Sequence, residues 1–338
     1  MTEIVLTPAQ VLAFRRRVGA LDRRLPRSSA SLRRAAWAGL QDSMPRAAVL
    51  SIHARVEETG PTAWDDPALV QTWGPRFSAY VVPARDLAVF TLGRFPADAA
   101  GARRAEDTAA RLHAFLDGRT MTYGDAGRAM GVNPNALRYA AQTGTVLIRW
   151  EGARQPTLWT VPPPDVAIDD ARLELARRYL HVFGPGTAES FGVWAGIASR
   201  LARATFASLA PSLTPVRTSI GDGWALAEDE PALRAPPGPE APARLLPSGD
   251  AYFLLQGADR ELLVPDPDRR SQLWTPRVWP GAVLVEGEVV GTWRRAGSAV
   301  DVRAWRRLSA RERTAVEAEA ASLPLSDLAR PCDVRWEG

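Results

Sequence analysis

The stretch that decides the fold is Thr122-Tyr-Gly-Asp-Ala-Gly-Arg-Ala-Met-Gly-Val-Asn-Pro-Asn-Ala-Leu-Arg-Tyr-Ala-Ala-Gln-Thr-Gly144. Thr122 is a good N-cap for a short helix, and Gly131 supplies the sharp turn after it. Asn133 is a good cap for a second helix, Pro134 suits the first helical position, and Gly144 ends the helix. The stretch therefore predicts two helices joined by a tight turn.

A β-hairpin is predicted directly after these helices. Residues 145–150 and 157–161 have the composition of strands, and Glu151-Gly152 predicts a turn after the first of them. Helix, tight turn, helix and hairpin, in this order, are typical of a winged helix-turn-helix, a fold that often lays a helix on DNA.

The same order of elements is predicted a second time. Thr187 caps a helix that Gly196 ends, and Gly221-Asp-Gly223 forms the expected wing turn. The predicted segments are helices at 170–183, 188–195 and 198–209, and strands at 216–220 and 224–227. The two units share the plan but negligible sequence identity, so the repeat is architectural.

The remaining segments predict a third, degenerate unit and a β-rich end. The first hundred residues contain predicted helices near 8–20, 29–39, 45–57 and 84–93 and a strand at 77–82. Six prolines in residues 230–247 predict a linker. Strands are expected at 252–255, 262–264, 281–286, 288–293 and 300–305, before a helix at 309–323.

We therefore expect an α+β fold of tandem winged helix-turn-helix motifs, three in number, with a C-terminal β-rich portion. The expected division is a first winged-helix-like domain at 1–102, a second at 103–166, a third at 167–229, a Pro-rich linker at 230–247, and a β-rich region with a terminal helix at 248–338.

Composition excludes several classes of protein. In 338 residues, 46% hydrophobic and 24% charged side chains indicate a globular chain rather than a disordered one. Cys332 is the single cysteine and only three histidines occur, which excludes a disulfide framework and a Cys/His zinc cluster. Nucleotide-binding loops such as GxGxxG are absent, so we expect neither metal nor cofactor. With no apolar run of about 18 residues and no signal peptide, we expect a cytoplasmic protein, without a membrane partner.

The basic residues are all arginines: 42 of them, and no lysine. A GC-rich genome explains this usage, but it also removes every side-chain amine that could form a Schiff base. Residues 1–34 contain eight arginines and two acidic residues, and the rest of the chain sums to a net −2. The basic segment is either a patch for an anionic polymer or a solvated helix face.

The segment Gly39-Leu-Gln-Asp-Ser-Met-Pro-Arg-Ala-Ala-Val-Leu-Ser-Ile-His-Ala-Arg55 resembles the first-domain signature of the AlkZ/YcaQ superfamily of bacterial winged-helix DNA glycosylases. Later stretches resemble the superfamily in the expected order: Arg76-Phe-Ser-Ala-Tyr-Val-Val82, Tyr179-Leu-His-Val-Phe-Gly-Pro185, Leu245-Leu-Pro-Ser-Gly-Asp-Ala-Tyr252, Asp259-Arg260 and Leu284-Val-Glu-Gly-Glu-Val-Val-Gly-Thr-Trp-Arg294.

The resemblance implies tandem winged helices arranged in a C shape around duplex DNA, and excision of N-alkylated purines with unhooking of interstrand crosslinks. The family's catalytic signature is Gln, an aliphatic residue, then Gln or Asp. Gln41 matches the first position. Asp42 replaces the aliphatic residue and Ser43 replaces the second Gln or Asp. The resemblance therefore supports the expected fold more strongly than the expected activity.

The triplet suggests how the chemistry would be divided. A purine alkylated at N7 or N3 is already cationic, so its departure needs no general acid, and an amide can orient the attacking water. Gln41 is expected to do this. Neighbouring side chains of an extended segment face opposite ways, so Ser43 joins Gln41, and Asp42 caps the following helix. Asp42 is the third catalytic candidate, because its carboxylate would offset the positive charge of the sugar if the local backbone pointed it into the channel. A polar turn before a helix, without catalysis, is the alternative for the whole triplet.

The arginines expected to contact DNA come from three places. They are the basic N-terminal segment, the helix after the triplet with the strand that follows, and the middle winged unit, where Trp150 of the wing is a further candidate. These residues are Arg15, Arg16, Arg33, Arg46, Arg55, Arg76, Arg138 and Arg149. Of Arg46 and Arg55, one would contact phosphate while the other braces the core.

The sequence therefore predicts a monofunctional DNA glycosylase that acts as a monomer on alkylated or adducted duplex DNA and associates with the nucleoid. Two alternatives stay open: a winged-helix DNA-binding protein without catalysis, such as a lesion sensor or regulator, and a structural or partner-binding protein that keeps only the fold.

Overall fold

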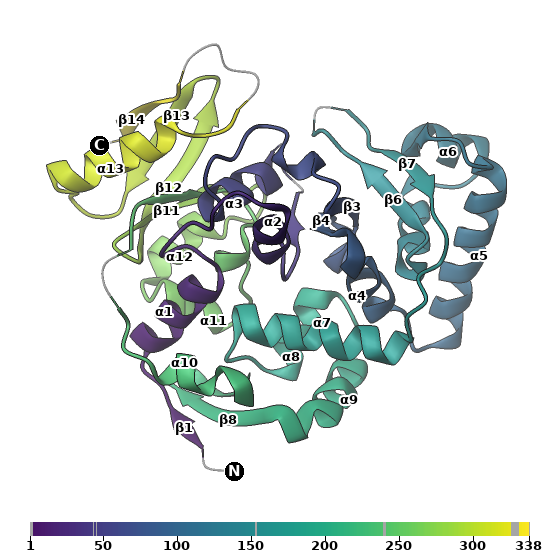
Figure 1. The fold of residues 1–338 in the computed structure, drawn as a ribbon, viewed down its shortest axis with the longest axis horizontal. Coiled ribbons are helices and arrows are strands. Elements are labelled where there is room, and N and C mark those ends of the chain that lie inside the picture. Colours follow the sequence, from purple (N-terminus) through teal and green to yellow (C-terminus); the bar gives the residue numbers. More distant parts are fainter. Residues whose placement is uncertain are drawn as a thin grey trace.

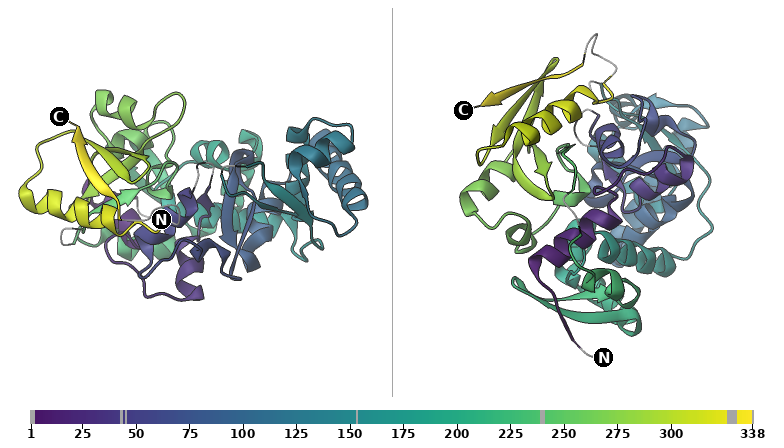
Figure 2. Two further views of the ribbon diagram at one scale, coloured as in Figure 1. Left: turned by 90° about the horizontal axis from the view of Figure 1, so that it is seen from above. Right: turned by 60° about the vertical axis from the view of Figure 1, so that its left-hand side comes forward.

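The computed structural model describes residues 3–42, 44, 46–152, 154–238, 241–325 and 331–337. It is a mixed α+β structure with four sheets in the described residues. The five-stranded sheet and α13 lie at one end of the long axis, and α5, α6, β6 and β7 lie at the other (Figure 1). Figure 2 shows the same two ends from above, with α3, β3 and β4 between them.

The central part is built on a three-stranded sheet in the order β2-β4-β3. Its helices precede and follow the short strand β2, as expected from the sequence, although α2 ends earlier than the predicted 29–39. The elements up to residue 94 are β1 Ile4–Val5, α1 Pro8–Val18, α2 Ser29–Ala35, β2 Leu40–Gln41, α3 Ala47–Arg55, η1 Ala63–Asp65, β3 Leu69–Trp73, η2 Pro75–Phe77, β4 Ala79–Pro83, η3 Ala84–Asp86, α4 Leu87–Thr91 and η4 Leu92–Arg94.

The stretch that opens the sequence analysis folds as its caps predict. Thr122 accepts the backbone N–H of Asp125, Asn133 accepts that of Asn135, and Gly144 ends the second helix with φ +76°. That second helix is 3₁₀ throughout. The elements are α5 Ala99–Leu116, β5 Met121–Thr122, α6 Tyr123–Ala129, η5 Pro134–Thr143, β6 Val146–Arg149 and β7 Thr157–Thr160, with the sheet order β5-β7-β6.

The second predicted repeat also forms, but its hairpin turns earlier than expected. Thr187 caps α8 as predicted. Thr218 pairs with Gly221, so the turn lies at residues 219–220 and Gly221-Asp-Gly223 belongs to a strand. The N-terminal strand β1 completes this sheet in the order β1-β8-β9. The elements are α7 Ile168–Phe183, α8 Ala188–Ala195, α9 Ser199–Leu209, η6 Ala210–Ser212, β8 Leu213–Thr218 and β9 Gly221–Leu226.

The C-terminal region is the part that the sequence predicts least well. Residues 230–247 are not only a linker, since they contain a helix and the first strand of the five-stranded sheet. The expected strands at 252–255 and 262–264 are wrong: a 3₁₀ turn and a short helix lie there. The elements are η7 Ala227–Asp229, α10 Glu230–Arg234, β10 Arg244–Leu246, η8 Ala251–Phe253, α11 Asp259–Leu263, α12 Pro267–Leu273, β11 Gly281–Val285, β12 Glu288–Ala296, β13 Ala299–Ala304, α13 Ala310–Ala321 and β14 Asp333–Glu337.

The largest hydrophobic cluster joins the central sheet, the α7–α9 helices and the C-terminal region. Tyr80, Trp194 and Phe253 are each at most 1% exposed in it. This shared core holds the elements around β2 in fixed positions. No helix among the described residues is long and apolar enough to cross a membrane.

Candidate catalytic site and DNA-binding surface

Gln41 ends the short strand β2, where it lies opposite Tyr80 of β4. Gly39, just before it, has φ +74°, and a Cβ there would come within 2.9 Å of the Tyr80 ring, so the strand lies directly on that ring. Gln41 Oε1 accepts a hydrogen bond from Arg76 Nη2 at 3.0 Å and lies 3.5 Å from the Tyr80 hydroxyl. These contacts fix the orientation of the Gln41 amide.

The backbone at Gly249 closes the other side of the Gln41 side chain. Gly249 has φ +76°, and a Cβ there would lie 3.1 Å from Gln41 Nε2. The next residue, Asp250, accepts two hydrogen bonds of 2.7 Å from Arg55 and one of 2.6 Å from Ser51. This segment is therefore anchored to α3, which follows the triplet.

Asp42 lies inside the fold, as its expected role as a helix cap requires. It is 5% exposed, and its Oδ1 accepts the backbone N–H of Ala48, in the first turn of α3, at 3.0 Å. Its Oδ2 accepts Gln71 Nε2 at 2.7 Å. Burial raises the pKa of Asp42 from 3.8 to about 6. Ser43 lies outside the described residues.

Arg76 is carried by a tight turn between β3 and β4. Arg76 and Phe77 have φ +55° and +57°, in the left-handed region, which is uncommon for residues with a side chain. Gly196, from the turn between α8 and α9, packs so closely that a Cβ there would lie 3.0 Å from the backbone nitrogen of Arg76. Packing from the turn between α8 and α9 thus helps to hold Arg76 toward Gln41.

Two further arginines lie near Arg76. Arg94 is buried and donates to the carbonyls of Ala195 and Trp73; burial lowers its pKa to about 10. Arg260 lies over the rings of Trp274 and Trp279, and burial, followed by the charge of Arg76, lowers its pKa. No ion pair joins Arg76, Arg94 or Arg260 to a carboxylate of the described residues, so the surroundings of Gln41 are cationic.

Three arginines expected to bind DNA lie in the interior instead. Arg15 is 3% exposed and donates to the carbonyls of Phe183 and Gly184 and to Asp259. Arg16 is 7% exposed and donates to Asp22 and to a carbonyl. Arg55, 3% exposed, pairs with Asp250 and is the one that braces the core. Because their guanidinium groups are already enclosed and bonded, we exclude these three from the DNA-binding surface.

The other five predicted arginines are half-buried and reach the surface. They are Arg33 on α2, Arg46 before α3, Arg76, Arg138 on η5 and Arg149 at the end of β6. Arg149 forms an ion pair with Asp65 and lies 4.0 Å from the ring centroid of Trp64. It therefore joins the wing to η1, and of the five it is the least available to DNA.

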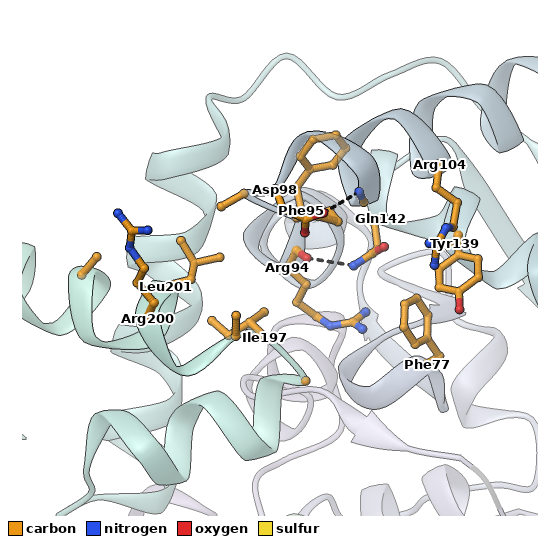
Figure 3. Close-up of a pocket in the computed structure, with 16 residues that line it drawn as sticks. Phe77, Arg94, Phe95, Asp98, Arg104, Tyr139, Gln142, Ile197, Arg200 and Leu201 are labelled. Carbon is orange, nitrogen blue, oxygen red and sulfur yellow. Dashed lines mark hydrogen bonds between the residues drawn. The ribbon is translucent and has the colours of Figure 1, made fainter.

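Two cavities lie on either side of the turn that carries Arg76 and Phe77. The first, of about 460 Å³, separates this turn from η5 and the β6–β7 hairpin. The second, of about 610 Å³, lies between α9 and the helices α5 and η5. Figure 3 shows the second, with Ile197 and Leu201 on one wall, Arg104 and Tyr139 on the other, and the Arg94 side chain extending toward Phe77.

Several residues of this site were not among the predicted site residues. Tyr80, Gly249 and Arg260 stand in stretches that resemble the superfamily, but their place beside Gln41 and Arg76 follows only from the tertiary fold. Arg154 had a local signal, because arginine close to Trp150 in a wing is the interleaving of basic and aromatic residues typical of nucleic-acid surfaces. In the described part of the chain, no group of three or more potential metal ligands occurs.

Comparisons with known proteins agree with this architecture. The sequence model of the family described as DNA glycosylase AlkZ-like matches residues 32–324. The solved structure of the DNA glycosylase AlkZ from Streptomyces sahachiroi is similar in fold, with a TM-score of 0.78 at 20% identity, over 99% of this chain and 100% of that one.

A curated relative is similar over a shorter stretch. The interstrand DNA cross-link repair glycosylase of Streptomyces sahachiroi is 31% identical over 129 residues, which are 37% of this chain and only 34% of that protein. The family model, in contrast, extends from α2 to the end of α13 and includes Gln41. The resemblance noted in the sequence is confirmed, and the chain belongs to the AlkZ-like family of DNA glycosylases.

Proposed function

We propose that this protein hydrolyses the N-glycosidic bond of alkylated purines, cationic or bulky, in duplex DNA, and that Gln41 orients the attacking water. One observation carries the proposal: the Gln41 amide accepts a hydrogen bond of 3.0 Å from Arg76, which, like Arg94 and Arg260 nearby, forms no ion pair with an acidic residue of the described chain. Such a site binds phosphates and presents one fixed polar group.

The contacts of Gln41 suit this role. The bond from Arg76 to Oε1 fixes the direction of the amide, and the Tyr80 hydroxyl lies 3.5 Å from the same oxygen. An amide that is held in one direction can orient a water molecule by hydrogen bonding. Burial raises the pKa of Tyr80, so its hydroxyl stays protonated. Asp42 acts at a distance, through α3 and Gln71, rather than on the sugar.

The reaction should stop at the abasic site. A coupled lyase step needs an amine to form an imine with the opened sugar, and the chain has no lysine. Borohydride treatment during the reaction should therefore trap no covalent protein–DNA adduct. An efficiently trapped adduct would overturn the monofunctional assignment.

The DNA would be bound by three winged helices, whose domains we place at 1–102, 103–166 and 167–229, followed by residues 230–247 and the β-rich region at 248–338. The sheets β2-β4-β3 and β5-β7-β6 each accompany helices within one of these domains, and the hairpin of β8 and β9 follows the helices α7 to α9, which supports this division. Arg33, Arg46, Arg76, Arg138 and Arg149 supply the phosphate contacts, and the protein acts as a monomer. The name of the curated relative adds interstrand crosslinks as candidate substrates.

A DNA-binding protein without catalysis is the second candidate, because position 43 holds Ser where the family signature has Gln or Asp. Incubation with duplex DNA containing N7-alkylguanine, then alkali, separates the two. Strand breaks that require the protein, and that diminish in Gln41→Ala, support the glycosylase. Binding without breaks supports the second candidate. A crosslinked duplex in the same assay tests unhooking.

A further inference from the structure

The cavity of about 460 Å³ combines aromatic and arginine side chains. It lies between η2 with β4 on one side and η5 with the β6–β7 hairpin on the other. Arg76, which lines it, donates to Gln41, so the cavity adjoins the proposed catalytic residue. The lining residues that matter here are Trp73, Arg76, Tyr123, Arg138, Trp150 and Arg154.

The aromatic part of the lining offers surfaces on which a base can stack. The rings of Trp73 and Tyr123 have centroids 5.9 Å apart, and the side chains of Tyr123 and Trp150 are partly exposed. Aromatic rings stack on any base, because every base has a π face.

The position of Trp150 is set from the interior. Its backbone N–H donates to Gln71 Oε1 at 2.5 Å, and Gln71 Nε2 donates to Asp42 at 2.7 Å. The end of the wing is thus fixed to the buried Asp42, beside Gln41.

Two arginines of the lining, Arg138 and Arg154, form no ion pair with a described acidic residue. Arg138 Nε is buried and has no hydrogen-bond partner among the described residues, and the guanidinium lies 5.8 Å from the Tyr123 ring centroid. Arg154 is exposed, and no ion pair joins it to a described residue. Arg149, close by on the same hairpin, shows the opposite case because Asp65 neutralises it. A phosphate is the acceptor that the guanidinium fork fits best.

The larger cavity has a different character. Arg94 at its base already donates to two carbonyls, and Arg104 lies over the Tyr139 ring (Figure 3). Asp98, on the same wall, adds a negative charge. Of the two cavities, the smaller one therefore suits an aromatic ligand with a phosphate.

We infer that the cavity of about 460 Å³ holds one extrahelical nucleotide of the bound DNA, with its base against Tyr123 and Trp150 and its phosphate at Arg138 and Arg154. Its volume lies in the usual range of about 300–1,000 Å³ for ligand pockets. A base within the stack cannot present its face to these rings, so the occupant must have left the duplex. The inference shares the DNA substrate of the proposed function but requires no excision.

The test compares the affinities of the full chain for two undamaged duplexes, one fully paired and one with a single unpaired 2-aminopurine nucleotide. An unpaired base costs least to displace, and stacking is worth roughly tenfold or more in affinity, so we expect the second duplex to bind about tenfold more tightly. Stacking on Trp150 should also quench the fluorescence of the 2-aminopurine.

Three variants and one matched control locate the effect. Trp150→Leu should abolish the quenching, and Arg138→Gln and Arg154→Gln should reduce the affinity ratio toward one. Arg154 is exposed, so its variant should fold even if the others are less stable. Arg103→Gln, an exposed arginine on α5 outside the cavity, should keep the full ratio and the quenching.

An affinity ratio of one in the wild type would overturn the inference, as would an unchanged ratio in both arginine variants. Competition by free deoxyguanosine monophosphate at the same affinity would assign the cavity to a free nucleotide and overturn its assignment to DNA. Excision together with an affinity ratio of one would refute only the proposal that the cavity holds a nucleotide. A tenfold affinity ratio without excision would refute only the proposed glycosylase activity.

Discussion

The arginines of α1 and those around the smaller cavity contrast sharply. Arg15 and Arg16 belong to the most basic segment of the sequence, yet both are buried. They donate hydrogen bonds to backbone carbonyl groups and to Asp259 and Asp22 respectively. Arg138 and Arg154 come from a segment with no unusual charge, yet no ion pair joins either to a described residue. The density of charge along the chain therefore says less about binding than the presence of a partner does.

The difference has a structural cause. Arg15 joins α1 to the carbonyls at the end of α7, and the strand β1 before it pairs with β8. The N-terminal segment is thus part of the scaffold. Arg138 and Arg154 instead lie beside a cavity, and no described acidic residue forms an ion pair with them.

The largest effect is expected from breaking a buried pair. Arg55→Met leaves the carboxylate of Asp250 buried without its cation, which typically costs about 3–5 kcal/mol in the free energy of unfolding. Urea denaturation measures the loss. Arg154 is exposed, so Arg154→Gln should change the free energy of unfolding by less than about 0.5 kcal/mol.

The double variant Arg55→Met/Asp250→Leu provides the control, because it removes both charges. It should recover part of the loss, although the hydrogen bonds that Asp250 accepts from Ser51 and Tyr252 are not replaced. Equal stability of Arg55→Met and the wild type would mean that the pair is not enclosed.

Asp42, the buried neighbour of Gln41, should make the free energy of unfolding depend on pH. Its raised pKa means that the folded state keeps the Asp42 proton up to about pH 6, whereas the unfolded state loses it near pH 3.8. The favourable contribution is therefore complete below pH 3.8 and is lost as the pH rises toward 6, by at most about 3 kcal/mol at 1.36 kcal/mol per pKa unit.

Asp42→Asn cannot titrate, so the difference in unfolding free energy between wild type and variant isolates this group. That difference should shift against the wild type between pH 4 and pH 6 and stay level above it. A constant difference over this range would show that Asp42 titrates at its ordinary pKa.

Substitution of Gln41 gives the sharpest test of the proposed excision reaction. Gln41→Ala should reduce excision by roughly 10²-fold, the usual loss for one positioned polar group. Ser43→Asp restores a carboxylate of the family signature and should raise the rate, whereas Ser43→Ala should cost less than Gln41→Ala. Single-turnover excision measures the rates.

DNA affinity measured alongside separates chemistry from binding. If Gln41→Ala leaves a robust wild-type rate unchanged, the assignment of Gln41 is wrong. If only Ser43→Asp excises, the wild type is the DNA-binding protein of the second candidate.

The smallest effect concerns the salt dependence of binding to undamaged duplex. Each phosphate contact contributes about 0.9 to the slope of log affinity against log salt. The sequence alone predicts that replacing Arg15, Arg16 and Arg17 with Gln lowers this slope. Because the first two are buried, we now expect a larger decrease from the triple variant Arg76→Gln, Arg138→Gln and Arg154→Gln. Titrations over a range of salt concentrations decide between the two sets.

The sequence was most informative where structure depends on neighbouring residues. The caps at Thr122, Asn133 and Thr187 act within two or three residues, so local chemistry determines them. The strands at 252–255 and 262–264 were predicted wrongly because short apolar runs fit a buried helix or turn as well as a strand. The strand β14, which was not predicted, pairs in parallel with β13 and packs on α13, and both contacts are with segments outside its own neighbourhood in the chain.

The sequence by itself determined the helices and hairpins of the two clearest repeats, the family signature from Gln41 and the absence of any lysine, because these are properties of residues close together in the chain or of composition. Only the tertiary structure decided which arginines remain available, that Asp42 faces Gln71 rather than the site, and that Arg76, Tyr80 and Gly249 surround Gln41. The physical reason is that the availability of a charge depends on its burial and its partners. Those partners, such as Asp250 for Arg55 and Asp259 for Arg15, lie 195 and 244 residues away in the chain.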